Sequence, residues 1–309
     1  GEGGFGEDYK LLEKKTRKLY TAKISYTTIN IALSENSPKI LQKLNIFSKI
    51  DHLSINKFIG FSPINFNNES KPVIITPFFP NGSLNNIIEN ERISKFIEGW
   101  DETKKLIIIL GIALGMSYLH SHDIFHGNLK SSNILIDDYL FPRISDFWLN
   151  NLQQIQDENQ FQESSHEIRK YSMNDDIFAF GTIVFELMTS KVPFEGLDSF
   201  HYFLEIINIR HPSSKIPSTE VYHDLIKRCC SSNQEEKPTF DEIVNELKKN
   251  PKYITDSIDK EYFRKYIELI DEYQELNEEE KKQINVDEII QKRGYKIFQK
   301  VDLKSKSEF

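Results

Sequence analysis

The N-terminal part of the chain alternates between hydrophobic and polar positions in the manner of short β-strands. Apolar and β-branched residues dominate 9–12 and 19–25, and the charged turn between them predicts a hairpin. A continuous apolar run at 73–76 predicts a buried strand. Ser37 and Pro38 predict a helix start, because serine caps a first turn and proline fits its first position.

The pattern becomes helical after a break at 77–82, where proline and glycine predict a hinge. Periodicity predicts helices over 101–120, 176–189, 220–230 and 241–249, short strands near 134–136 and 143–145, and a polar loop at 150–165. This order predicts an α+β fold in two lobes. We expect a small β-rich lobe over 1–79 and a larger helical lobe over 80–249.

Residues 250–309 have a charge pattern of their own and are expected to form a helical extension. Residues 268–280 hold seven acids and no base, whereas 281–306 are mostly basic. An apolar stripe predicts a helix docked through it, and its members are Tyr262, Phe263, Tyr266, Ile267, Ile270 and Tyr273. Two interpretations stay open: a solvated tail helix, and a helix that binds a protein partner.

Composition and charge exclude several function classes. Lys and Arg number 39 against 47 Asp and Glu, a net charge of −8, so we expect no nucleic-acid partner. The two cysteines, Cys229 and Cys230, exclude a disulfide framework and fit a reducing compartment, which predicts a cytoplasmic protein. The longest apolar run, 106–119, is too short to span a bilayer, so no membrane is expected. The oligomeric state stays open.

A glycine-rich string opens the chain and is followed by the predicted hairpin. Gly1, Gly3 and Gly6 form a G-x-G-x-x-G pattern, which by itself is a weak signal. A dinucleotide-binding fold needs a helix directly after the glycines, but here a second strand follows and carries Ala22 and Lys23. A glycine-rich strand–turn–strand with a following lysine is typical of protein kinases.

Further motifs follow in kinase order. Residues 126–135 stand at the H-R-D-L-K-x-x-N position, 146–148 at D-F-G, 176–181 at the helix after the activation segment, and 237–240 at a late R-P-T block. Over residues 1–249 the chain therefore resembles a eukaryotic protein kinase domain, most similar to the tyrosine-kinase-like group of serine/threonine kinases. The resemblance implies a two-lobed protein-kinase fold.

The resemblance also implies a role for each matching residue. Lys23 would hold the α- and β-phosphates of ATP, Lys130 would screen the γ-phosphate, and Asn133 and Asp146 would hold Mg²⁺. The other implied nucleotide contacts are Gly1, Gly3 and Gly6 over the phosphates, Ala22 and Leu135 around adenine, and Thr76 as gatekeeper. Phe47, His126 and Phe147 match the family's regulatory spine.

The position of the catalytic base departs from the family pattern. Asn128 stands where active kinases carry aspartate. An amide accepts no proton near neutral pH, and general-base catalysis is worth roughly 10²–10⁴-fold, so we expect impaired catalysis. Gly127 replaces the neighbouring arginine that binds a phosphorylated activation loop in active relatives.

Three more substitutions affect the cleft. Lys43 stands where a helix glutamate normally pairs with Lys23, and we expect Lys43 to turn to solvent. Trp148 replaces the glycine of D-F-G, so a bulky ring needs its own packing or fills the cleft. Asp8 stands where kinases place a valine over adenine: facing inward it would weaken nucleotide binding, and a register slip would turn it outward.

Retained apolar positions with altered chemical positions resemble pseudokinases, including those of Janus kinases and some receptor-like kinases. The first hypothesis is a catalytically impaired pseudokinase that acts in signalling as a scaffold or allosteric partner and keeps weak ATP and Mg²⁺ binding. The alternatives are a slow serine/threonine kinase that uses the ATP γ-phosphoryl group, and an interaction module with a closed cleft that acts through 250–309.

Overall fold

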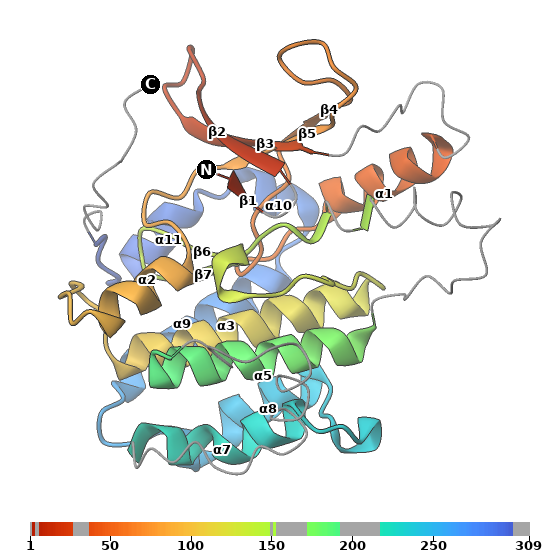
Figure 1. Cartoon of the computed structure of the whole chain (residues 1–309). Helices are drawn as coiled ribbons and strands as arrows, with labels where there is room; N and C mark the ends of the chain where they lie inside the picture. Colours follow the sequence, from red (N-terminus) through yellow and green to blue (C-terminus); the bar gives the residue numbers. More distant parts are fainter. Residues whose placement is uncertain are drawn as a thin grey trace.

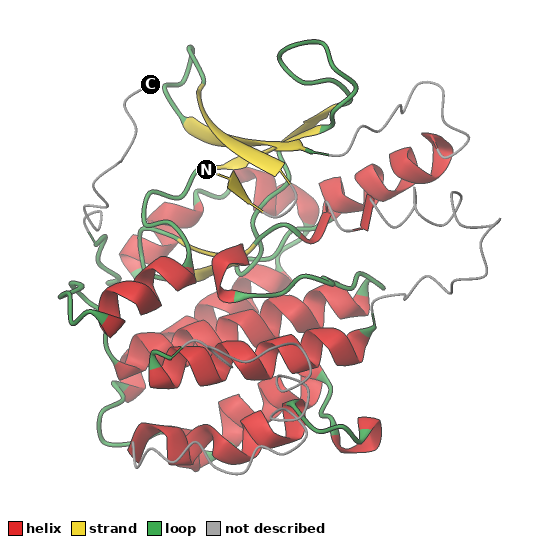
Figure 2. Cartoon of the chain, viewed as in Figure 1, coloured by secondary structure: helices red, strands yellow, loops and turns green. Residues whose placement is uncertain are grey.

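The structure, a computed structural model, describes residues 2–3, 6–26, 37–148, 151–152, 172–191 and 217–298. In this part of the chain a β-sheet with one helix lies above a larger helical lobe (Figures 1 and 2). The predicted α+β fold in two lobes is confirmed. Gly1, the loop expected at 150–165 apart from 151–152, and the end of the chain from 299 onward lie outside the described residues.

The small lobe is built on an antiparallel sheet with strand order β1-β2-β3-β5-β4. Its strands are β1 (Glu2–Gly3), β2 (Gly6–Leu12), β3 (Leu19–Ser25), β4 (Gly60–Ser62) and β5 (Val73–Pro77). The predicted hairpin is confirmed, because β2 and β3 pair along their whole lengths, from Gly6↔Ser25 to Leu12↔Leu19. Helix α1 (Ser37–Lys49) buries Ile40, Leu44 and Phe47 on one face and leaves Leu41 exposed.

The large lobe packs helices around α3, beside a two-stranded sheet. Its elements are α2 (Leu84–Arg92), α3 (Glu102–Ser121), η1 (Ser131–Asn133), β6 (Ile134–Ile136), β7 (Pro142–Ile144), α5 (Met173–Thr189), α7 (Pro217–Cys229), η2 (Gln234–Glu236) and α8 (Phe240–Lys249). The predicted helices and strands are present, with ends shifted by a few residues. Helix α2 and strand β4 were not predicted.

Helix α3 is apolar on all sides because neighbours surround it. Two glycines admit close contacts: a Cβ atom at Gly111 would lie 2.5 Å from Pro142, and one at Gly115 would lie 2.6 Å from Ile144. The apolar run at 106–119 belongs to this 20-residue helix, which by length and composition would suffice to cross a membrane. Since 78% of its apolar window is buried inside the protein, we interpret α3 as a core helix.

The C-terminal extension folds against the large lobe instead of standing away from it. It consists of η3 (Pro251–Tyr253), α9 (Lys260–Glu275), α10 (Glu278–Gln283) and α11 (Val286–Lys292). The predicted stripe on α9 is the docked face, with Phe263, Tyr266, Ile270 and Tyr273 buried. The start of α9 is fixed to α3, because the Asp259 amide donates a hydrogen bond of 2.9 Å to the Thr103 hydroxyl.

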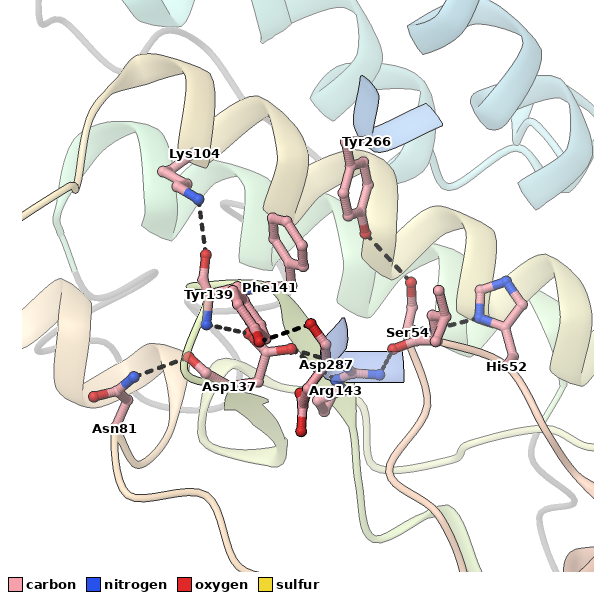
Figure 3. Close-up of polar contacts among 11 residues, drawn as sticks. His52, Ser54, Asn81, Lys104, Asp137, Tyr139, Phe141, Arg143, Tyr266 and Asp287 are labelled. Atoms are coloured by element: carbon pink, nitrogen blue, oxygen red, sulfur yellow. Dashed lines mark hydrogen bonds and ion pairs between the residues drawn. The ribbon is translucent and has the colours of Figure 1, made fainter. Parts of the chain in front are cut away.

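Lys104 is buried where the extension meets α3. Its ammonium donates a hydrogen bond of 2.7 Å to the Tyr139 carbonyl (Figure 3) and another to the Tyr262 hydroxyl. Its Nζ also lies 4.8 Å from the ring centre of Phe141 and 5.1 Å from that of Phe298. Burial lowers the pKa of Lys104 to about 7, although the nearby carboxylates of Asp137 and Asp101 oppose the shift.

This burial predicts a pH-dependent stability. Between about pH 7 and the ordinary lysine pKa, the unfolded chain binds one proton more at Lys104 than the folded chain does. The free energy of unfolding should therefore rise with pH in this window, by up to about 1.4 kcal/mol per pH unit. Urea titrations of the wild type and Lys104→Met at pH 7, 8 and 9 test it, since the wild-type-minus-variant difference should grow with pH. Lys95→Met, at an exposed lysine, is the control, and a difference that stays constant for Lys104→Met contradicts the prediction.

Candidate active site

Three charged side chains meet between the two lobes. The ammonium of Lys23, on β3, forms an ion pair with Asp146, which follows β7, and lies 3.5 Å from Asp8 Oδ1 on β2. Burial opposes the charge on Lys23, but the attraction of Asp146 and Asp8 outweighs it and raises the pKa of Lys23. Burial raises the pKa of the Asp8 carboxyl in spite of Lys23. The structure thus brings together Lys23 and Asp146, two residues of the predicted nucleotide site.

The register of the small sheet decides which side chains face this cluster. Asp8 is the cross-strand partner of Lys23, so both lie on one face of the sheet. Asp8 therefore faces inward, and the register slip considered from the sequence is absent. Ala22 lies on the opposite face, in an apolar cluster with Ile24 and Val73. Ala22, which was predicted to lie beside adenine, therefore does not share the face of Lys23.

Thr21, and not Ala22, shares the face of Lys23. It stands two residues before Lys23, and side chains two apart in a strand share a face. Thr21 is also the register partner of the buried Thr76, the predicted gatekeeper at the end of β5. The period of two was visible in the sequence and would have favoured Thr21 over Ala22. Leu135, on β6 of the other lobe, is half-buried.

The glycine string is described only in part. Gly1 lies outside the described residues, and Gly3 on β1 pairs with Gly6 on β2. At Gly6 a Cβ atom would lie 2.1 Å from the carbonyl oxygen of Ile24, so any larger residue would disrupt the pairing with β3. Gly6 is therefore needed for close packing of the two strands.

The two residues implied for Mg²⁺ are held side by side. The backbone carbonyl of Asn133 accepts a hydrogen bond of 2.9 Å from the Ser145 amide, which directly precedes Asp146. The side-chain nitrogen of Asn133 donates to the carbonyl of Asn128 at 2.8 Å, so the amide oxygen points the other way. Mg²⁺ prefers oxygen ligands, and an amide oxygen beside a carboxylate fits it.

Asp176 anchors the loop that carries Asn128. Its carboxylate accepts hydrogen bonds from the amides of His126 (2.8 Å) and Gly127 (2.9 Å) and lies 2.9 Å from Nε2 of His120. Asp176 starts the helical motif at 176–181, but the sequence did not assign it this role. The loop therefore keeps a fixed backbone although the family's arginine is absent, and Asn128 is held at the predicted base position, half-buried. Lys130 is exposed.

Comparison with known families settles what this arrangement belongs to. The sequence model described as "Protein tyrosine and serine/threonine kinase" matches residues 1–247. The chain belongs to this kinase family. The protein-kinase fold expected from the motifs is thereby confirmed.

Several kinases are similar to this kinase domain. Protein STRUBBELIG-RECEPTOR FAMILY 5 of Arabidopsis thaliana is 29% identical over 272 residues, covering 80% of this chain and 38% of that protein. A probable serine/threonine-protein kinase of Dictyostelium discoideum is 30% identical over 273 residues, covering 81% of this chain and 27% of that protein. The dual specificity protein kinase shkC of the same organism is 26% identical over 262 residues, covering 80% and 49%. The chain thus spans less than half the length of each relative.

The three aromatic residues matched to the family's regulatory spine lie next to one another. The ring of Phe147 packs edge-on against Phe47 of α1, with centroids 5.7 Å apart, and lies 6.3 Å from the ring of His126. Trp148 is 1% exposed, and its ring centroid lies 4.5 Å from that of Phe147. The indole is therefore part of the core, as its size required. Among the described residues its N–H has no hydrogen-bond partner, which costs free energy.

Helix α1 of this kinase domain supplies no acid to Lys23. The segment Ser37–Lys49 contains neither Asp nor Glu. We expected Lys43 on this helix to turn to solvent, whereas in the structure it is half-buried. The described acids beside Lys23 come instead from β2 and from the residue after Ser145.

Proposed function

We propose that this kinase domain is a catalytically impaired pseudokinase of the tyrosine-kinase-like group, which retains ATP and Mg²⁺ binding and acts in signalling as a scaffold or allosteric partner. One observation carries the proposal. Asn128 stands at the base position of a loop whose backbone is fixed by Asp176, so the loop is built but its proton acceptor is missing.

The nucleotide part of the proposal rests on the ion-pair cluster. Lys23 is held between two lobes and keeps its positive charge, which suits the α- and β-phosphates of ATP. Asn133 and Asp146 would hold Mg²⁺, whose charge neutralises the phosphates when it is bound. Lys130 extends from the exposed side of the loop and would screen the γ-phosphate. Gly3, Gly6, Thr76 and Leu135 complete the proposed cleft, with Thr21 in place of Ala22.

A thermal-shift measurement tests nucleotide binding. With free ATP and Mg²⁺ at 100 times Kd, the folded state should gain about 2.7 kcal/mol, and the melting temperature should rise. Asp146→Ala should abolish the magnesium-dependent part of the shift, whereas Asp224→Ala, at an exposed acid on α7, should keep it. A wild type that gives no shift at saturating nucleotide contradicts ATP binding and favours an interaction module with a closed cleft.

The slow serine/threonine kinase is the second candidate, because Lys23, Asn133 and Asp146 are all brought together. Transfer of phosphate to a peptide that Asp146→Ala abolishes would overturn the pseudokinase proposal. We further propose lobe boundaries at 1–79 and 80–249, a cytoplasmic location, and protein partners that bind through the charged extension at 250–309.

A further inference from the structure

Among the described residues of the small lobe, the acid that pairs with Lys23 lies on the neighbouring strand. Asp8 and Lys23 are direct cross-strand partners of β2 and β3, and the carboxylate oxygen Oδ1 lies 3.5 Å from Nζ. In an antiparallel pair such partners have Cβ atoms about 4.5–5.5 Å apart, so the sheet itself fixes the two groups face to face.

We propose that Asp8 is a positioning residue, which holds Lys23 toward the nucleotide phosphates and replaces the acid that helix α1 lacks. This inference rests on the proposed ATP binding. An acid on α1 could reach Lys23 only by movement of that separate helix. Asp8 needs no such movement, because its own strand, β2, is paired with β3. The lysine would then be held whatever the position of α1.

Because Lys23 is positively charged, the inward-facing carboxylate of Asp8 has a different effect on the cleft from the one expected from the sequence. From the sequence, an inward-facing Asp8 was expected to lie at an apolar purine slot and to weaken nucleotide binding. In the structure it faces the ammonium group of Lys23, whose side chain is only 15% exposed, so the charge needs a counter-charge. Asp146 also forms an ion pair with Lys23, but bound Mg²⁺ would compete with Lys23 for the Asp146 carboxylate. Asp8 is then the described acid that remains with Lys23.

Two measurements on the full chain test the proposal. The first is the rate at which acetic anhydride labels Lys23, followed by peptide mass spectrometry, and the second is the affinity for ATP with Mg²⁺. Asp8→Asn keeps the shape of the side chain and removes its charge, and Asp8→Glu keeps the charge. Glu7→Gln is the matched control, because Glu7 is adjacent on β2 and faces the other side of the sheet.

Asp8→Asn should raise the labelling rate of Lys23 and weaken ATP binding, each by roughly three- to fivefold, as expected for a partly exposed ion pair. Asp8→Glu should restore both values, and Glu7→Gln should change neither. Unchanged labelling in Asp8→Asn, or tighter ATP binding, overturns the proposal. If the wild type itself binds no ATP, the proposed function fails at that point, while the labelling still shows whether Asp8 holds Lys23.

Discussion

Replacing Asn128 by aspartate is expected to raise phosphoryl transfer to a peptide by about 10²–10⁴-fold, the usual contribution of a positioned general base. The new side chain has nearly the same shape as the old one. Its backbone position is already fixed, because the Asn128 carbonyl accepts from Asn133 and its amide donates to Nδ1 of His126 at 3.3 Å. The carboxylate should therefore stand where the substrate hydroxyl proton has to be accepted.

A radiometric transfer assay with ATP and Mg²⁺ measures this gain. Asn245→Asp adds the same negative charge at an exposed position on α8 and should leave the rate unchanged. Adding Asp146→Ala to Asn128→Asp should remove the activity, which shows that transfer takes place in this cleft. A wild type that is already as fast as Asn128→Asp would contradict the impaired-kinase proposal.

If Asn128→Asp binds ATP but remains inactive, the missing base is only one of several defects of the cleft. Trp148 is buried against Phe147 and removes the freedom that glycine gives this segment in active kinases. Lys43→Glu, combined with Asn128→Asp, would test whether an acid on α1 is needed in addition to Asp8.

The fold could be predicted wherever the chain carried strong local signals. The hairpin was predicted with both ends of β3 and the end of β2 correct and the start of β2 three residues late, since a charged turn separates two β-type runs and its register follows from closing the turn. Strand β4 has only three half-buried residues, too few for a period to be seen. Helix α2 was missed because its capping box uses Asn86 in place of the usual Glu or Gln.

The sequence motifs predicted which residues belong to the candidate site, but they predicted less well which way the side chains face. Spacing identified Lys23, Asn133 and Asp146, which the structure brings together. The choice of Ala22 ignored the strand period, which places Thr21 beside Lys23. The pairing of Asp8 with Lys23 depends on the alignment of two strands, and the motifs alone carry no information about which acid replaces the one absent from α1.

Replacing Tyr266 by alanine is expected to lower the free energy of unfolding by about 3–5 kcal/mol, the usual cost of truncating a buried aromatic side chain. Tyr266 is 1% exposed on α9, and its ring lies 4.8 Å from that of Phe141. Its hydroxyl points at Ser54, 3.5 Å away (Figure 3), and fits over Gly111, where a Cβ atom would lie 2.4 Å from it. The cavity would open between the extension and the core helix α3, where neighbours cannot readily close it.

Urea titration measures this loss, with Phe96→Ala as the control, because Phe96 is 85% exposed and its removal should change stability by less than about 0.5 kcal/mol. Tyr266→Phe separates the hydroxyl from the ring and should cost far less than Tyr266→Ala. A loss below about 1 kcal/mol for Tyr266→Ala would mean that α9 is not part of the cooperative unit.

The result bears on the cleft as well, because the Tyr273 hydroxyl on the same helix donates a 2.9 Å hydrogen bond to Asp51, in the segment between α1 and β4. Through this contact the docked extension holds the end of the helix that carries Phe47, so weakening α9 should also weaken the support of the spine at Phe147.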